Sequence, residues 1–241
     1  MDRTKSGYVY LLIVIGLLMA FLLLSLSRQN AAPSSQATGS PEMTIVLPAP
    51  RLESDTSIEA ALLARRSIRE YAPQPLTLAE LGQLLWAAQG ITGANDRYRT
   101  APSAGALYPL ELYVFVGDVD GLEAGVYHYA PASHELARHQ ATADRAALTE
   151  AALDQDWIAE GPVVLVVSAV YHRTTKKYGA RGEQYVHMEA GHAAQNVALQ
   201  AGALELGTVT VGAFDVAAVR RVVGLTDDET PLYLMPVGHL R

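Results

Sequence analysis

The pattern of apolar and polar positions divides the chain into helices and strands. Apolar residues at helical spacing begin near Ser57, and Thr77-Leu-Ala-Glu80 has the spacing of a capping box before a helix that ends at Gly90. Residues 110–116 form an apolar, β-prone run, and residues 162–171 are the most hydrophobic stretch after residue 50. The pattern predicts two helices followed by two core strands, the second of which is covered on both faces.

The rest of the pattern predicts shorter elements around one long helix. In chain order it indicates a hairpin (125–129 and 135–138), an amphipathic helix (144–154), a polar loop (171–183), a long helix rich in Ala and Gly (185–206), a short strand and turn (207–214), a helix capped by Asp215 and a final strand (232–237). Helices and strands alternate without a regular βαβ repeat. The predicted fold class is therefore α+β, with a mixed sheet covered by helices.

The N-terminal region has a different composition. Residues 8–26 are an uninterrupted apolar run, as long as the ~20 residues that a bilayer core requires. Arg3 and Lys5 precede the run, so the positive-inside rule places the N-terminus in the cytoplasm. The alternative is a cleavable signal peptide, but the small residues after the run form a mediocre cleavage site.

Residues 29–50 are rich in Ser, Ala, Pro and Gln, a composition typical of a flexible linker. We therefore predict a cytoplasmic tip and transmembrane anchor (1–28), a linker (29–50) and a single domain (51–241) outside the cytoplasm. The predicted localisation is that of a single-pass membrane protein that contacts the lipid bilayer through residues 8–26.

Composition and missing motifs exclude several function classes. The chain has 241 residues, a formal net charge of -7 and no cysteine, which argues against a nucleic-acid binder and excludes thiol chemistry. No dinucleotide or P-loop glycine motif is present, and the seven histidines lack the spacing of a metal site. Pro102-Ser103-Ala104-Gly105 resembles part of a nucleophile elbow. Ala101 stands where that motif needs glycine, so a serine hydrolase is only a minor alternative.

Two segments are candidate binding elements. Arg65, Arg66, Ser67 and Arg69 follow the first helix, and three guanidinium groups with a hydroxyl can grip a phosphate. The alternative is a solvated basic patch. The small residues from Pro102 to Ala106 precede a core strand, where main-chain groups could approach a flat ligand. The alternative for this segment is a plain connector that fits a tight corner.

Several short motifs occur in a fixed order within residues 57–241. They are Arg65-Arg66-Ser67-Ile68-Arg69, Pro102-Ser103-Ala104-Gly105-Ala106-Leu107-Tyr108-Pro109, Lys177-Tyr178-Gly179, Arg181-Gly182, Glu189-Ala190-Gly191-His192 with Gln195-Asn196, Val211-Gly212-Ala213-Phe214 and Pro236-Val237-Gly238. In this order the motifs resemble the FMN-dependent nitroreductase superfamily. More narrowly, they resemble the branch that oxidises azolines to azoles in peptide-derived natural products, the SagB/ThcOx-like dehydrogenases.

The resemblance implies a mostly antiparallel sheet and a homodimer with two FMN sites at the subunit interface. It assigns the flavin phosphate and ribityl chain to Arg65, Arg66, Ser67 and Arg69, with Arg241 as a second phosphate contact. Pro102, Ser103, Ala104 and Gly105 would lie along the isoalloxazine ring of the partner's site, and Val211 and Gly212 near its reactive edge.

In the azoline-oxidising branch a Lys-Tyr pair is implicated in catalysis, and Lys177-Tyr178 matches its position. Dehydrogenation requires a base to remove a proton while hydride leaves to the flavin. The alternative is that Lys176 and Lys177 are ordinary loop cations. Members of the azoline-oxidising branch that this chain resembles are soluble, so a membrane anchor would be a departure from them.

The sequence-based hypothesis is a membrane-anchored FMN oxidoreductase acting on a small-molecule or peptide-derived substrate. The principal alternative is a protein that binds or senses FMN without turnover, and retention of Lys177-Tyr178 favours the enzyme. An extracytoplasmic domain would have to acquire FMN outside or be exported folded, and no twin-arginine pair precedes the apolar run.

Overall fold

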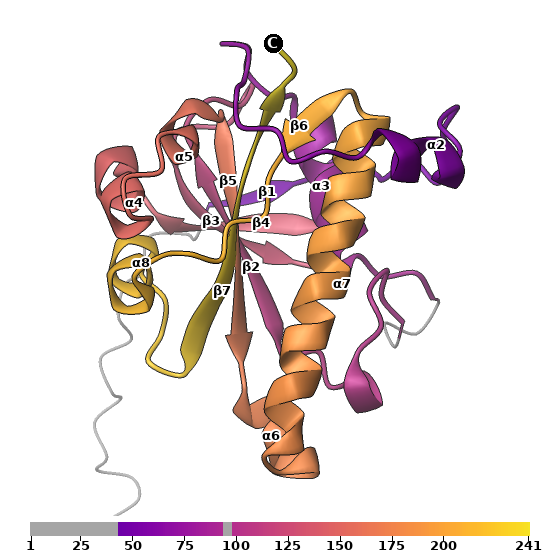
Figure 1. Ribbon diagram of the computed structural model, residues 1–241, viewed down its shortest axis with the longest axis vertical. Helices are drawn as coiled ribbons and strands as arrows, with labels where there is room; N and C mark the ends of the chain where they lie inside the picture. Colours follow the sequence, from indigo (N-terminus) through magenta and orange to yellow (C-terminus); the bar gives the residue numbers. More distant parts are fainter. Residues whose placement is uncertain (1–42, 94–97) are drawn as a thin grey trace, which may run out of the picture. The chain divides into compact units, whose positions relative to one another are not determined.

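The computed structural model describes residues 43–93 and 98–241. One sheet of seven strands organises this part of the chain, in the order β1-β4-β3-β2-β5-β7-β6 (Figure 1). The strands are β1 (Thr44–Val46), β2 (Leu110–Val116), β3 (Gly125–Ala130), β4 (Glu135–Gln140), β5 (Val163–Val170), β6 (Leu206–Thr208) and β7 (Glu229–His239). Every pair of neighbouring strands is antiparallel, so the prediction of a mixed sheet is corrected.

Helices flank this sheet. They are α2 (Ile58–Ala64), α3 (Leu78–Gln89), α4 (Arg145–Ala151), α5 (Trp157–Glu160), α6 (His172–Tyr178), α7 (Arg181–Ala203) and α8 (Val216–Val223), with a 3₁₀ turn, η1, at Ala104–Ala106. Figure 1 shows α3 and α7 on one side of the strands and α4 and α8 on the other. The observed architecture confirms the predicted α+β class with helices flanking an antiparallel sheet.

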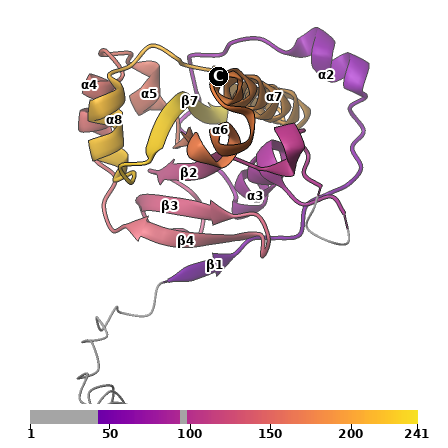
Figure 2. The same ribbon diagram turned by 90° about the horizontal axis from the view of Figure 1, so that it is seen from below.

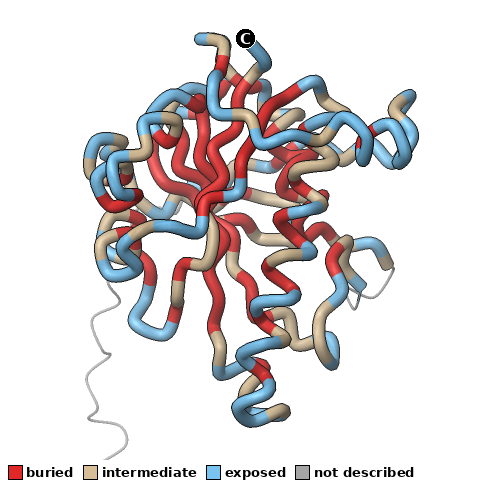
Figure 3. The backbone as a smooth tube through the Cα atoms, viewed as in Figure 1, coloured by how far each residue is buried: buried red, intermediate tan, exposed pale blue. Residues whose placement is uncertain are grey.

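Two apolar cores lie on the two faces of the sheet because side chains alternate along each strand. On β2, Leu112 and Val114 pack into the core beneath α3 and α7, whereas Tyr113 and Phe115 pack into the core beneath α4, α5 and α8. Strand β5 is buried at all of its positions, as predicted for a central strand (Figure 3). This rigid double-sided core carries the loops that form the candidate site.

The capping residues in the sequence correctly predicted where three of the helices begin. Thr77 and Glu80 form the predicted capping box of α3, and the Asp215 side chain accepts a hydrogen bond from the Ala218 amide at the start of α8. Ser57 caps α2 in the same way. The predicted hairpin is present as β3 and β4.

Two local predictions were wrong. The segment 171–183, predicted as a polar loop, contains helix α6 and the first turn of α7. Most of its polar residues are exposed or half-buried on a short helix, although Thr174 is buried, and hydrophobic periodicity does not detect such a helix. Residues 44–46, within the predicted linker, form strand β1, which pairs with β4 at the sheet edge (Figure 2). Backbone pairing with β4 holds this strand, and its three β-branched residues, Thr44, Ile45 and Val46, are a strand signal that the linker prediction did not use.

The predicted localisation also requires correction. Across residues 43–93 and 98–241, the search for a helix of sufficient length and apolar character to span a bilayer gives none. The structure therefore gives no support to a single-pass membrane protein, and that prediction is withdrawn. The predicted anchor, residues 8–26, and the first part of the predicted linker lie outside the described residues.

Candidate active site

The structure brings Ser67 and Arg69 together with the C-terminal Arg241. All three line one open hollow with a volume of about 520 Å³. Backbone pairing places them there, because the Ile68 amide donates to the Thr208 carbonyl at 3.0 Å and Tyr71 pairs with Leu240. Two segments at opposite ends of the domain thus present two guanidinium groups and a hydroxyl to one surface.

The other two predicted phosphate ligands do not line this hollow. The Arg66 guanidinium folds back and donates to the carbonyls of Leu63 and Arg65, at 3.0 and 2.8 Å. Arg65 lies at the end of α2 and is half-buried. Arg69 is held over the Trp157 ring, 5.3 Å from its centroid, and this contact fixes the cation at the rim of the hollow.

The Pro102–Gly105 turn meets Lys177 and Tyr178. Gly105 has a φ of 65°, in the left-handed region that favours glycine. A Cβ built at Gly105 would lie 2.7 Å from the Tyr178 hydroxyl and 2.9 Å from Lys177 Nζ. The absent side chain leaves space for these two polar groups directly against the turn. The pairing of the small-residue turn with the Lys-Tyr pair in one subunit was not predicted from the sequence.

A Gly105→Ala variant is expected to lose turnover, because its methyl group displaces Lys177 and Tyr178. We expect a stability cost of about 1–2 kcal/mol from the left-handed backbone. Gly121→Ala is the matched control, since Gly121 has a φ of 76° and nothing within 4 Å of its built Cβ. Urea unfolding and steady-state turnover measure both effects. If both variants lose equal stability and neither loses turnover, the contact at Gly105 has no role in catalysis.

Helix α6 positions Lys177 and Tyr178. The helix ends at Gly179, whose amide donates to the Thr175 carbonyl at 2.8 Å. Lys177 Nζ lies 5.2 Å from the centroid of the Tyr178 ring, and this ring packs edge-on against Tyr185 of α7 with centroids 5.2 Å apart. Lys177 is exposed and Tyr178 half-buried, so a substrate can reach both groups.

Val211 and Gly212 lie beside strand β7. Val211 pairs with Leu234 of β7, with both backbone hydrogen bonds at 2.9 and 3.0 Å. Val211 is buried, whereas Gly212 is exposed, and a Cβ built at Gly212 approaches Tyr233 no closer than 3.7 Å. The exposed Gly212 backbone is therefore open to a ligand.

The predicted site residues form two separate groups in one subunit. The Ser67–Arg241 hollow lies beside β6, because Ile68 pairs with Thr208, and β6 follows the C-terminal end of α7. Lys177 and Tyr178 belong to α6, which lies at the N-terminal end of α7 (Figure 1). With 23 residues, α7 is about 34 Å long. The two groups therefore lie at opposite ends of this helix.

A protein-family model with the description "Nitroreductase family" matches residues 62–239. The match covers nearly the whole domain. The chain belongs to the nitroreductase family. This membership confirms the broader part of the sequence resemblance and argues against the serine hydrolase alternative. Members of this family are generally flavin-dependent oxidoreductases.

Individual relatives agree with this assignment. A protein of Methanocaldococcus jannaschii named as a nitroreductase is 49% identical over 195 residues, covering 81% of this chain and 96% of the relative. A nitroreductase structure from Ralstonia eutropha superposes with a TM-score of 0.72 at 30% identity, covering 85% of this chain and 93% of that one. The microcin B17-processing protein of Escherichia coli is 32% identical over 137 residues, 54% of this chain and 50% of its own length.

The nitroreductase domain also buries a charged cluster behind the Pro102–Gly105 turn. Glu189 of α7 is 2% exposed, and Oε1 of its carboxyl has no hydrogen-bond partner within the described residues. Burial raises the pKa of Glu189 to about 7, although Ser103, Arg99 and Gln89 partly offset this effect. Sequence reasoning placed Glu189 in a family motif but assigned it no role.

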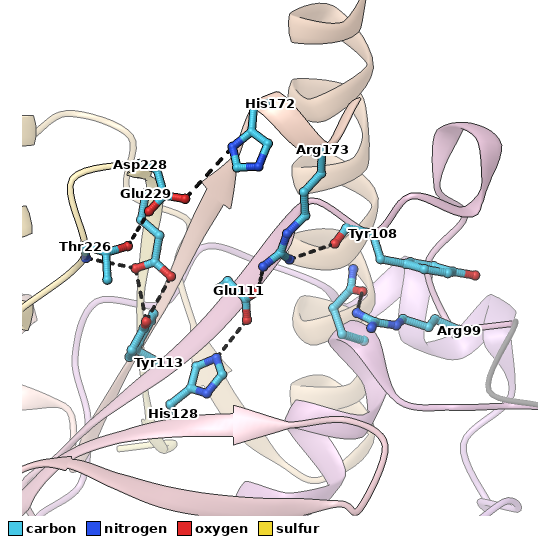
Figure 4. Close-up of polar contacts among 11 residues, drawn as sticks. Arg99, Tyr108, Glu111, Tyr113, His128, His172, Arg173, Thr226, Asp228 and Glu229 are labelled. Carbon is cyan, nitrogen blue, oxygen red and sulfur yellow. Dashed lines mark hydrogen bonds and ion pairs between the residues drawn. The ribbon is translucent and has the colours of Figure 1, made fainter. Parts of the chain in front are cut away.

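A second polar network connects α6 to the sheet of this nitroreductase domain (Figure 4). Glu111 of β2 contacts His128 Nε2 at 2.7 Å through one oxygen and Arg173 Nη2 at 2.5 Å through the other. Burial raises the pKa of Glu111, but His128 and Arg173 together outweigh it and hold the pKa below its usual value. The sequence gave no signal for this network, because its members lie far apart along the chain.

Proposed function

We propose that this protein is an FMN-dependent oxidoreductase that acts as a homodimer, with hydride transferred through N5 of the flavin. Within the family we propose the azoline-oxidising type of reaction, on a small-molecule or peptide-derived substrate. The observation that carries the proposal is the contact of Gly105 with Lys177 and Tyr178. It places two proton-carrying groups beside a small-residue turn suited to a flat ring.

The residues of the hollow fit the phosphate end of FMN. Arg69 and Arg241 provide guanidinium donors and Ser67 a hydroxyl, which is the donor set that a phosphate group requires. Arg241 Nη1 lies 3.7 Å from Oε2 of Glu70, which also lines the hollow. Both side chains are exposed, so this ion pair is weak and a phosphate could replace the carboxylate beside Arg241. To bind the phosphate as well, the Arg66 guanidinium would have to give up its two hydrogen bonds to backbone carbonyls.

The turn and Gly212 fit the ring end. Gly105 lacks the side chain that would otherwise fill the space before Lys177, and Gly212 exposes backbone without a Cβ. Main-chain groups at such positions can approach a planar ring closely. When bound, FMN would supply a hydride acceptor at N5.

Two subunits are needed to complete one site in this proposal. The hollow and the Lys177 region lie at opposite ends of α7, a helix about 34 Å long. The five-carbon ribityl chain of one FMN cannot bridge that distance. A homodimer in which one subunit holds the phosphate and its partner supplies the Pro102–Gly105 turn resolves the geometry.

Lys177 and Tyr178 would manage the proton of the reaction. In a dehydrogenation, one substrate C–H bond breaks with its electron pair leaving as hydride, and a second hydrogen leaves as a proton. The neutral amine form of Lys177 would accept that proton at Nζ, and the Tyr178 hydroxyl would orient the substrate atom that loses it. The similarity to the microcin B17-processing protein supports this choice of substrate class, since that relative is named for processing microcin B17.

Mixed dimers test the shared site. One subunit carries Arg69→Ala and Arg241→Ala, and the other carries Lys177→Ala; each variant alone is expected to be inactive. Co-expressed with different affinity tags, the mixed dimer regains one intact site, since the Lys177→Ala subunit supplies the arginines and its partner supplies Lys177. We expect about half of the wild-type turnover per dimer. No recovery in a purified mixed dimer would contradict a site built from two subunits.

A further inference from the structure

Arg173 connects two parts of the proposed site. It lies on α6 four residues before Lys177, so the two side chains share one face of the helix. Its Nη2 lies 2.5 Å from Glu111 Oε1, and its Nη1 donates to the Tyr108 carbonyl at 3.2 Å. One guanidinium group thus contacts both strand β2 and the end of the turn that begins at Pro102 (Figure 4).

The carboxylate that holds Arg173 is itself fixed. Glu111 is 16% exposed, and its second oxygen contacts His128 Nε2 on the neighbouring strand β3 at 2.7 Å. The lowered pKa of Glu111 keeps this group ionised near neutral pH. A carboxylate held on two strands of a rigid sheet is a firm anchor for a guanidinium group, because the planar fork loses little freedom on binding.

The turn that Arg173 contacts has an unusual backbone. Ala106 and Tyr108 have positive φ angles of 53° and 45°, which are uncommon for residues other than glycine. The Tyr108 amide donates to Ser103 Oγ at 2.9 Å, and the Arg99 guanidinium lies 4.3 Å from the Tyr108 ring centroid. Such a conformation persists only where surrounding contacts determine it.

We infer that Arg173 is a positioning residue: held by Glu111, it ties helix α6 to the Tyr108 end of the turn and so keeps Lys177 and Tyr178 against Gly105. The inference rests on the proposed function, in which these two groups act on the substrate. Neither Arg173 nor Glu111 touches substrate or flavin in this account. Their effect is on the geometry of the residues that do.

The variants are Arg173→Gln, Glu111→Gln and the double variant, all in the full chain, with Arg221→Gln on α8 as the matched control. NADPH and menadione serve as the probe reductant and acceptor, and in this assay Lys177 and Tyr178 would supply the proton that menadione takes up with its hydride. We expect kcat to fall about 10- to 100-fold for either single variant, with KM and FMN content unchanged. The kcat of the double variant should be no lower than that of either single variant, because each single substitution already removes the same Arg173–Glu111 ion pair.

Hydrogen–deuterium exchange provides a readout that does not depend on turnover. Arg173→Gln should speed exchange in residues 172–179 and 103–108, whereas Arg221→Gln should leave both segments unchanged. Unaltered exchange and unaltered kcat in Arg173→Gln would overturn the inference, even in an active wild-type enzyme. A wild-type protein that binds no FMN would instead overturn the proposed function, and the exchange data would still decide whether Arg173 ties α6 to the turn.

Discussion

Replacing Lys177 with alanine is expected to lower turnover by about 10²–10⁴-fold while leaving FMN bound. The loss follows from removing the amine that accepts the substrate proton, which lies against the Gly105 turn and far from the Ser67–Arg241 hollow. Steady-state kinetics measures the loss, and the visible spectrum of the purified variant measures its flavin content.

Lys176→Ala is the control for this variant. Lys176 is the neighbouring lysine on α6 and is likewise exposed, but it is Lys177 whose amine meets Gly105. The control should keep turnover within about twofold of the wild type. Equal losses of turnover in the two variants would mean that turnover depends on the positive charge of α6. Lys177 would then have no specific role as a proton acceptor. Full activity in Lys177→Ala would remove Lys177 from the mechanism.

Glu189→Gln is expected to stabilise the protein at alkaline pH. Burial raises the pKa of Glu189 from 4.5 in the unfolded chain to about 7 in the folded protein, so the folded state favours the protonated form. The contribution to stability is complete below pH 4.5 and is lost as the pH rises through 7. At 1.36 kcal/mol per pH unit, the loss is about 3 kcal/mol by pH 8.5.

Glutamine has nearly the shape of the protonated carboxyl and does not ionise. The difference in unfolding free energy between Glu189→Gln and wild type should be near zero at pH 4.5 and about 3 kcal/mol in favour of the variant at pH 8.5. Urea unfolding at the two pH values measures it. Glu183→Gln, at an exposed position of the same helix, should show no such trend. A variant less stable than wild type at pH 8.5 would show that the ionised form of Glu189 is the one the fold requires.

Sequence reasoning succeeded where the information is local. The capping residues of α3 and α8 and the apolar strands β2 and β5 are determined by neighbours within a few residues, and these elements appear where they were predicted. The association of Arg241 with Ser67 came from the family resemblance, and the structure places both residues at one hollow. Spacing along the chain could not have indicated it.

The residues that were missed act through contacts between distant segments. Glu111, His128 and Arg173 come from two strands and a helix, and their meeting depends on strand register. Helix α6 was missed because its polar sequence lacks an apolar stripe, so its packing on α7 is visible only in three dimensions. The two-subunit site was implied by the resemblance and stays a proposal, and the length of α7 is one argument for it.

The visible absorption spectrum of the purified full chain decides whether this protein carries a flavin. We expect the spectrum of a bound flavin and release of FMN on denaturation, with about one FMN per subunit. Added FMN should restore any fraction that is lost during purification. A folded, colourless protein that cannot be reconstituted with FMN would contradict the proposed oxidoreductase and every cofactor contact assigned to it.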